Sequence, residues 1–359
     1  MVFVDIKDIF ITIVSRTANG KSTNRSIQIC VNVFCPIIYY KLTIRKYNKI
    51  TYDTSYIARP NCKWTIKLRT MTLMQEFNTK GEFENTTFES NLSTGLKPKL
   101  NVQVGYMGIA LAGGISFNKL KGGQDRDFDI KLNMYGKKFG FELGLSGIES
   151  LHGNYILDVP GWSEFPLIND NDTTWVSLPI EVEVPEGKVS QTVFNFNFYY
   201  AFNNKKFSYP AAFTQMFLQK KSAGSLLVGG EIHANIINIG DTLEGDELFR
   251  LTNATYGLGV GYGYNLVLPH HWLIHASVLP YLVLHSKTTV RNYMQGEGHS
   301  VTAEFPEVFI ISKAAIVHDF NTRWFAGATG QLNWSNVNSK KVKTGNSQWQ
   351  VFIFVGIRL

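Results

Sequence analysis

The sequence predicts an antiparallel transmembrane β-barrel, and three observations lead to this fold class. Charged residues make up 18% of the 359 residues and aromatic residues 13%, at a mean hydropathy of −0.06. From Asn61 onward apolar residues recur with a period of two, the period of a β-strand. The last stretch, SQWQVFIFVGIRL, alternates up to Leu359, whereas the end of a soluble domain usually frays.

The composition argues against several other classes of protein. A helical membrane protein shows runs of about 20 apolar residues, which this sequence lacks. The net charge of +7 is spread over turns, so nucleic-acid binding, which needs a clustered basic stripe, is not expected. Cys30, Cys35 and Cys62 have no histidine at a ligand spacing, so we expect no metal site and no cofactor. A Cys30–Cys35 disulfide stays open.

Residues 1–52 are expected to form an N-terminal extension. Export to the outer membrane requires a signal peptide with a basic start and an apolar core. The segment SIQICVNVFCPIIYY follows Lys21 and Arg25 in that order, but polar residues interrupt it. The extension is therefore interpreted as a degenerate signal or a misassigned start, with an N-terminal pair of strands as the alternative.

The strands are read from alternation. In TYGLGVGYGYNL (255–266) bulky residues alternate with glycine and asparagine, and a tight turn, YGKK, separates strands at 127–135 and 138–146. Segments at 148–190, 240–252 and 286–305 are expected to be loops at one end, opposite short turns. This gives about 12 strands (10–14) in a single barrel domain over residues 53–359. The other strands are expected at 64–71, 98–106, 108–118, 194–202, 226–239, 271–285, 306–318, 322–335 and 348–358, with 82–90 and 207–218 uncertain.

The two faces of these strands favour a barrel over a sandwich. The polar face of a soluble sandwich carries many Lys and Glu, whereas here it is rich in Gly, Ala, Ser and Asn, which suits a narrow lumen. The aromatic faces would then meet lipid. Tryptophans near strand ends are predicted to be membrane-interface aromatics, namely Trp64, Trp272, Trp324, Trp334 and Trp349.

The C-terminal strand is predicted to close the barrel, because closure pairs the last strand with the first. Outer-membrane proteins commonly end in such an alternating strand. We therefore expect the barrel-assembly machinery to recognise the segment from Trp349 to Leu359.

Four segments carry a resemblance to a known family: DTSYIARPNCKWTIKLR (53–69), NMYGKKFGFEL (133–143), NNKKFSYPAAFTQMFLQKKSAGSLLVGGEI (203–232) and GVGYGYNLVLPHHW (259–272). Over roughly residues 53–359 and in matching order, the sequence resembles a family of uncharacterised Bacteroidetes proteins catalogued as domain of unknown function number 4421. The resemblance implies an outer-membrane barrel of a Gram-negative envelope. It implies no established activity, so no catalytic residue is carried over.

Alternation fails within residues 208–222. Ala212, Phe213 and Met216 have helical spacing, and Pro210 suits a helix start. A short helix is predicted to plug the lumen or cross its mouth, with Lys220 and Lys221 meeting internal carboxylates. The alternative is a bent strand followed by a basic turn.

Ionisable residues gather on the faces predicted to line the lumen. Such residues either serve function or form a salt-bridged polar core, and we favour the core. The members of this lumen polar cluster are Asp127, Asp129, Lys131, Glu142, Glu231 and His233.

A catalytic site is a weaker alternative. Some outer-membrane barrels are lipid hydrolases or acyltransferases that use Ser, His and a carboxylate. His275 and Ser277 share a strand face and could place a base beside a nucleophile, with His233 as a further candidate. No G-x-S-x-G elbow surrounds any serine.

The sequence therefore predicts an integral outer-membrane barrel in contact with outer-membrane lipids. Its expected role is structural, or the binding or passage of an unidentified small molecule. A lipid-active barrel enzyme and a soluble all-β envelope binding protein are the two alternatives.

Overall fold

The computed structural model describes residues 11–16, 26–31, 52–83, 86–117, 127–136, 138–158, 164–169, 172–177, 180–240, 247–292, 298–302, 305–339 and 341–359. Contacts divide the chain into two units, Met1–Thr51 and Tyr52–Leu359. In the first unit, β1 (Ile11–Arg16) and β2 (Ser26–Val31) pair antiparallel. The remainder of the candidate signal segment lies outside the described residues.

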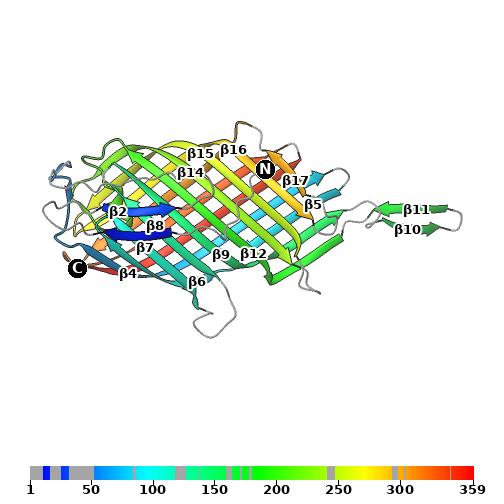
Figure 1. Cartoon of the computed structure of the whole chain (residues 1–359), viewed down its shortest axis with the longest axis horizontal. Coiled ribbons are helices and arrows are strands. Elements are labelled where there is room, and N and C mark those ends of the chain that lie inside the picture. The colour runs from blue at the N-terminus through cyan, green and yellow to red at the C-terminus, as the bar shows by residue number, and fades with distance from the viewer. Residues whose placement is uncertain are drawn as a thin grey trace. The chain divides into compact units, whose positions relative to one another are not determined.

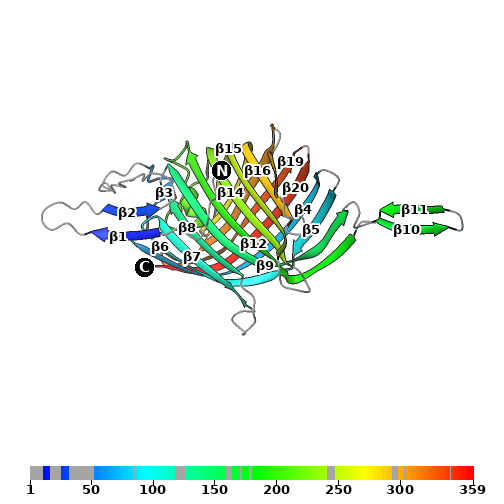
Figure 2. The ribbon, with the colours of Figure 1, turned by 45° about the vertical axis from the view of Figure 1, so that its right-hand side comes forward.

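The second unit is a closed antiparallel barrel with tilted strands (Figures 1 and 2). Within the described residues, 12 strands form a ring in which each pairs with the next. The predicted fold class is therefore confirmed. In ring order the strands are β4 (Trp64–Phe83), β6 (Lys97–Tyr106), β7 (Ile109–Ser116), β8 (Phe128–Tyr135), β9 (Phe139–Asp158), β12 (Ile180–Ala201), β14 (Ala223–Gly240), β15 (Glu247–Leu268), β16 (Trp272–Asn292), β18 (Val308–Asp319), β19 (Trp324–Asn338) and β20 (Val342–Arg358).

The C-terminal strand closes the ring. β20 pairs with β4 from Arg358 opposite Thr65 to Val342 opposite Gly81. The Leu359 N–H also donates to the Trp64 carbonyl at 2.9 Å. The backbone at the C-terminus is therefore hydrogen-bonded, which explains why alternation continues to the last residue.

The two ends of the barrel differ. Turns at 107–108, 269–271 and 320–323 join strands at one end, which we call the short-turn end, and β8 and β9 follow one another at the same end. At the opposite, long-loop end, β5 (Thr86–Thr94) pairs with both β4 and β9. β6 pairs with β4 only over residues 64–73 of β4, and β5 pairs with β4 over residues 76–83. The strands β6, β7 and β8 therefore belong to the wall only in the half nearer the short-turn end, and β5 takes their place between β4 and β9 in the other half.

Three segments predicted as loops are largely strand, so that prediction was wrong. Residues within 148–190, 240–252 and 286–305 extend β9, β12, β15 and β16 and form β17 (Gly298–Thr302), β10 (Glu164–Asn169) and β11 (Asp172–Ser177). Where both faces of a strand carry polar residues, the period-two contrast in hydrophobicity disappears. Sequence pattern alone then reads a strand as a loop.

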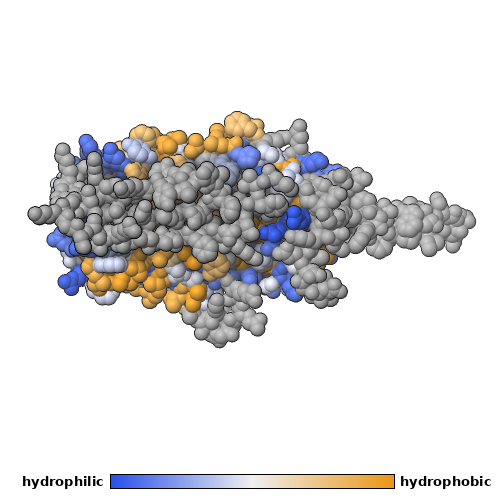
Figure 3. Space-filling view, in the orientation of Figure 1, coloured by the Kyte–Doolittle hydropathy of each residue, from blue (hydrophilic) through white to orange (hydrophobic). Residues whose placement is uncertain are grey.

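The outer face of the strands is apolar over part of their length. Four residues of β15 point outward and are exposed, namely Tyr256, Leu258, Val260 and Tyr262. Gly259, on the other face of the strand, is buried. Figure 3 shows apolar residues gathered along the visible part of the barrel surface, with hydrophilic residues toward both ends. No helix in the described part of the chain is long and apolar enough to cross a membrane.

The five tryptophans lie on this outer face in two groups. Trp64, Trp272 and Trp324 begin their strands at the short-turn end, and each is exposed. Trp334 and Trp349 lie toward the long-loop end, on neighbouring strands β19 and β20. Trp324 and Trp334 are ten residues apart on one strand, which corresponds to roughly 25 Å along the barrel axis at the usual rise and tilt. That distance matches the apolar band of an outer-membrane barrel.

Candidate functional site

The segment between β12 and β14 folds into the lumen at the short-turn end. It contains the five-residue helix α2 (Tyr209–Phe213), which begins after Ser208, whose side chain accepts from the Ala211 N–H at 3.3 Å. Farther on, β13 (Leu218–Gln219) pairs with β3 (Ile57–Ala58). We call residues 207–219 the plug. The short helix predicted for this region is present, and most of the plug is buried.

Two basic residues of the barrel wall hold the plug. Lys67 on β4 donates through Nζ to the Phe213 carbonyl at 2.6 Å. Arg358 on β20 donates through Nε to the Gln215 carbonyl at 2.8 Å, and its Nη2 pairs with Asp319 at 2.6 Å. Phe213 is the last residue of α2, and Gln215 follows the C-cap residue Thr214. The two bonds therefore satisfy one carbonyl at the end of the helix and one just beyond it, where the helix supplies no partner.

Lys220 and Lys221 do not reach carboxylates inside the lumen, so that expectation was wrong. Both are exposed; Lys220 donates to the Thr54 carbonyl at 3.1 Å, and Lys221 lies 5.5 Å from the centre of the Tyr56 ring. The cations inside the lumen come from strands instead. Alternation along β4 and β20 would have placed Lys67 and Arg358 on the inner face.

His275 and Ser277, the predicted base and nucleophile, are in contact on β16. His275 Nε2 lies 3.0 Å from Ser277 Oγ, and His275 Nδ1 lies 2.7 Å from Asn265 Oδ1 on β15. Because an amide oxygen only accepts, Nδ1 carries the proton, and Nε2 of the neutral ring accepts from the serine hydroxyl. The three side chains thus have the connectivity of a nucleophile, a base and an orienting group.

The plug covers this trio. The Tyr209 and Phe213 rings each lie 5.1 Å from the His275 ring, and the Tyr209 hydroxyl is 3.4 Å from Ser277 Oγ. Only 1% of His275 is exposed. Asn265 Nδ2 donates to the Ser208 carbonyl at 2.9 Å, so the trio also ties the plug to the wall. Sequence reasoning had identified the histidine and serine but not Asn265.

The six residues predicted as one lumen polar cluster fall into three groups. In the first, Asp127 pairs with Lys99 Nζ at 3.1 Å, and Asp129 lies 3.4 Å from Asn101 Nδ2 and 4.0 Å from Lys131 Nζ. Lys131 also donates to Gln350 at 2.7 Å. This group joins β6, β8 and β20.

The second group contains Glu142 on β9. Its two oxygens accept from Lys313 Nζ on β18, each at 2.7 Å, and one also accepts from the Tyr135 hydroxyl at 2.6 Å. Lys313 Nζ lies 5.9 Å from the centre of the Tyr209 ring in the plug. These contacts are those of a salt-bridged core.

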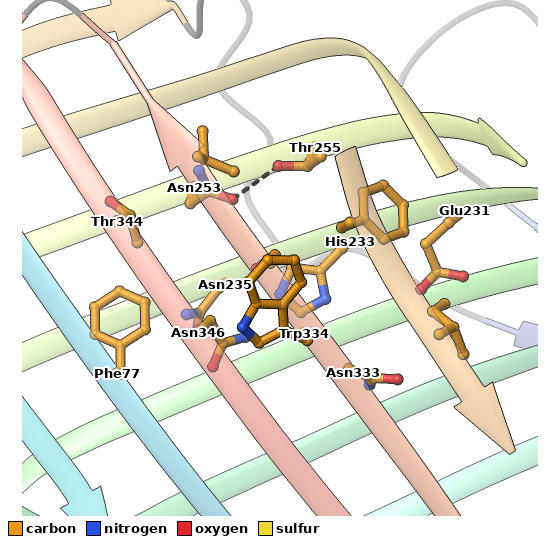
Figure 4. Close-up of a pocket in the computed structure, with 14 residues that line it drawn as sticks. Phe77, Glu231, His233, Asn235, Asn253, Thr255, Asn333, Trp334, Thr344 and Asn346 are labelled. Atoms are coloured by element: carbon orange, nitrogen blue, oxygen red, sulfur yellow. Dashed lines mark hydrogen bonds between the residues drawn. The ribbon is translucent and has the colours of Figure 1, made fainter. Parts of the chain in front are cut away.

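The third group, Glu231 and His233 on β14, forms no ion pair with any residue that the structure describes, and it lines a cavity of about 60 Å³. His233 Nδ1 contacts Asn195 Oδ1 at 2.5 Å. Figure 4 shows Glu231, His233 and Asn235 together on one wall and Asn333 and Asn346 on strands that cross them. The lining residues are Phe77, Glu231, His233, Asn235, Asn253, Thr255, Phe309, Ile311, Asn333, Trp334, Ser335, Val337, Thr344 and Asn346.

An apolar cluster occupies the lumen side of the strands toward the long-loop end. Each of its 15 members is 7% exposed or less, so side chains rather than water fill the space beside them. The members are Met71, Leu73, Phe77, Phe88, Leu92, Ile148, Leu151, Val184, Val189, Ile237, Ile239, Leu251, Val290, Val342 and Phe352.

No metal site was found in the part of the chain that the structure describes: no three His, Cys, Asp or Glu side chains gather there. Among the described cysteines, Cys62 is free, and partial burial raises the pKa of its thiol.

A closed antiparallel ring with an apolar outer band, an inner plug and a filled polar lumen defines a plugged β-barrel of the outer-membrane type. Within that class, the chain belongs to the family described as domain of unknown function DUF4421, whose model matches residues 51–358.

Solved structures of outer-membrane barrels show a distant likeness. The outer membrane protease OmpT from Escherichia coli is 8% identical to this chain, with a TM-score of 0.45. The alignment covers 84% of this chain and 97% of that chain. The translocator domain of the autotransporter NalP from Neisseria meningitidis is 12% identical, with a TM-score of 0.32 and coverages of 81% and 88%. OprG from Pseudomonas aeruginosa is 11% identical, with a TM-score of 0.30 and coverages of 84% and 98%. No curated protein matches the chain. No conclusion about activity follows from likeness at this level.

Proposed function

We propose that the protein is an integral outer-membrane barrel, closed to ions at rest, that binds a small solute in its lumen cavity. The observation that carries this proposal is the cavity lined by Glu231, His233 and Asn235. Ligand sites are typically concave, with a few convergent polar groups among apolar ones. Short turns usually face the periplasm, so the plug would close the periplasmic end and the cavity would open outward.

The outer surface supports the membrane location. The band between Trp324 and Trp334 has the height that an outer membrane requires, and exposed tryptophans on both sides suit the two interfaces. Outer-membrane lipids are thus the proposed partners of this band. The strand from Trp349 to Leu359, with outward Val351, Ile353 and Val355, is the proposed signal for the barrel-assembly machinery.

The filled lumen favours binding over free passage. Lys67 and Arg358 fix the plug at one end, and the buried apolar cluster narrows the lumen toward the other. Recordings in planar lipid bilayers test this directly. We expect no steady conductance from the intact chain, and openings when residues 207–219 are replaced by a short Gly-Ser linker. Steady conductance of the intact chain would refute a closed barrel.

Access to the cavity is tested by cysteine labelling. In a background with Cys30, Cys35 and Cys62 changed to Ser, Ser335→Cys places a thiol in the cavity lining. The small neutral reagent methyl methanethiosulfonate should modify this thiol in intact cells. Complete protection of Cys at position 335, while an exposed reference, Thr87→Cys on β5, reacts, would rule out a solute-binding cavity open to the outside.

A lipid-active enzyme is the second candidate, because His275, Ser277 and Asn265 are linked by contacts of 3.0 and 2.7 Å. In the intact chain Tyr209 covers the serine, so activity would require the plug to move. A serine-directed fluorophosphonate should then label the plug-replaced chain and not its Ser277→Ala variant. Equal labelling of both would eliminate this candidate.

A further inference from the structure

The lumen cavity contains a carboxylate without a cation. Glu231 is 7% exposed, and its Oε2 is buried with no hydrogen-bond partner. Lys313 is the cation whose charge acts on Glu231, but both oxygens of Glu142 already occupy its ammonium group at 2.7 Å. Asn197 hydrogen-bonds to the Glu231 carboxyl group, but within the described residues no free cation pairs with it. A buried carboxyl group without a cation favours its neutral form, so a bound cation is needed to hold Glu231 ionised.

The other carboxylates predicted for the lumen are paired. Asp127 meets Lys99 and Glu142 meets Lys313 at hydrogen-bonding distance. If Glu231 served only to fill the lumen, we would expect it to be paired with a cation as Asp127 and Glu142 are, because a partly satisfied polar network is destabilising. Other buried side-chain atoms, such as Arg69 Nη2 and Gln103 Nε2, also lack a hydrogen-bond partner. Glu231 differs because it lines a cavity and has no free cation beside it, and this combination points to a missing ligand.

The surroundings of Glu231 define the chemistry of that ligand. His233 donates through one ring nitrogen to Asn195, which leaves the other nitrogen of a neutral ring as an acceptor. Phe309 also lines the cavity. Its ring stacks on the Tyr281 ring, with 4.8 Å between the ring centres and an angle of 2° between the ring planes. A carboxylate, a ring nitrogen and an aromatic face together suit a hydrogen-bond donor with positive charge.

The size of the cavity limits the ligand. A volume of about 60 Å³ corresponds to roughly four to six water positions. A few non-hydrogen atoms therefore fit. Polar amides at Asn235 and Asn346 line the rest of the space and can bind a hydroxyl or carbonyl beside the charged group.

We propose that the lumen cavity binds the ammonium group of a small organic amine, with Glu231 as its counter-ion. This inference rests on the proposed solute-binding role and specifies the ligand class. The route of entry runs along β19, which pairs with β18 only as far as Ser335, although β19 continues to Asn338. Among the described strands, β17 pairs only with β16, so no described strand pairs with the last residues of β19 on this side, where the Asn338 N–H donates to the Glu307 carboxylate instead.

The test compares reagents of different charge at Ser335→Cys in the full-length, cysteine-substituted chain. Aminoethyl methanethiosulfonate carries an ammonium group, the methyl reagent is neutral, and Thr87→Cys supplies the reference ratio of their rates. The quantity compared is the rate of modification by the ammonium reagent divided by the rate of modification by the neutral reagent. We expect this ratio to be about ten times larger at position 335 than at position 87, because an ionised carboxylate concentrates cations near it. Adding Glu231→Gln should bring the two ratios within about twofold of each other.

A competition experiment supplies the second arm. Propylammonium chloride should slow modification of Cys at position 335 by the neutral reagent, and Glu231→Gln should abolish this protection. An equal concentration of sodium chloride and of 1-propanol should not protect. Glu89→Gln, which alters an exposed carboxylate on β5 that is paired with Lys80, is the matched control and should leave protection intact.

The possible failures are distinguishable. If 1-propanol protects as well as propylammonium, or if Glu231→Gln changes nothing, the ammonium site is overturned while solute binding stands. If sodium chloride alone protects, the site holds inorganic cations and the organic ligand is overturned. If the neutral reagent never reaches position 335, both the site and the proposed function fail.

Discussion

Lys313 on β18 and Glu142 on β9 form an ion pair across the lumen, with both carboxylate oxygens 2.7 Å from Nζ. The two strands are not neighbours in the ring, so their side chains meet only in the interior. Lys313 also lies 5.8 Å from the centre of the Phe213 ring. The pair therefore connects opposite walls directly beside the plug.

Breaking this pair on one side should destabilise the barrel strongly. Lys313→Met leaves Glu142 as a buried carboxylate without its cation, a change that costs about 3–5 kcal/mol. Urea unfolding in lipid vesicles, followed by tryptophan fluorescence, measures the loss. The double variant Lys313→Met with Glu142→Leu should recover most of the stability. Equal instability of the single and double variants would show that the pair itself contributes little.

The glycine-rich inner face of β15 has a steric purpose that can be tested with one methyl group. A Cβ at Gly261 would lie 2.1 Å from the Val278 carbonyl oxygen, while at Gly113 no atom lies within 4 Å. Gly261→Ala should therefore cost about 1–3 kcal/mol through overpacking. Gly113→Ala should have no effect beyond a few tenths of a kcal/mol.

The measurement for the glycine pair is the fraction of chain that migrates as the compact, heat-modifiable form after refolding into detergent micelles. Gly261→Ala should lower this fraction and the temperature at which the compact band disappears. A Gly261→Ala protein as stable as Gly113→Ala would mean that β15 and β16 adjust their spacing freely.

Asn265 should control how firmly the plug is held. Its Nδ2 donates to the Ser208 carbonyl at 2.9 Å and to Gln219 Oε1 at 3.1 Å. Asn265→Asp replaces the donating amide nitrogen by a carboxylate oxygen in a side chain of similar shape. This oxygen would then lie against the Ser208 carbonyl oxygen and Gln219 Oε1, neither of which can donate to it. The lost bonds should cost about 1–3 kcal/mol, so we expect transient openings in single-channel recordings.

The control for the plug is Asn336→Asp, which makes the same change on the exposed side of β19. It should leave recordings as quiet as those of the original chain. If Asn265→Asp is equally quiet, the plug does not depend on this contact, and Lys67 and Arg358 suffice to hold it.

The fold could be predicted from sequence because its inner and outer faces differ so clearly within the apolar band. Along β18, alternation already places Lys313 on the same face as Phe309 and Ile311. Its partner Glu142 could not be predicted, because pairing across a lumen depends on strand number, tilt and stagger together. For the same reason Glu231 was grouped with the paired carboxylates, although its ring position leaves it beside a cavity.

The predicted strand lengths failed for a different reason. In β12, Glu181 and Glu183 point to one side, and Val182 and Val184 to the other, yet Pro185 and Gly187 interrupt the pattern. Proline is tolerated where a strand is bulged, and the pairing of β12 with β9 shifts register between Val184 and Val189. Pattern reading took this irregularity for a loop.

The outward apolar residues separate a membrane barrel from a soluble protein with the same strands. Ile353 on β20 is 64% exposed and lies between Trp349 and Leu359 on the outer face. In a bilayer, Ile353→Arg should cost about 2–4 kcal/mol, because the charge meets the hydrocarbon near its midplane. Asn336→Arg, on the outer face of β19 beyond Trp334, should cost at most about 1 kcal/mol.

Folding into lipid vesicles at increasing urea concentration measures both variants against the original chain. In water an arginine at an already exposed position would be harmless, because such surface substitutions usually change stability by less than about 0.5 kcal/mol. A soluble barrel would therefore tolerate Ile353→Arg as well as Asn336→Arg and would remain in solution without detergent. A clear difference between the two variants, seen only in lipid, establishes that the band between the two groups of tryptophans meets the hydrocarbon.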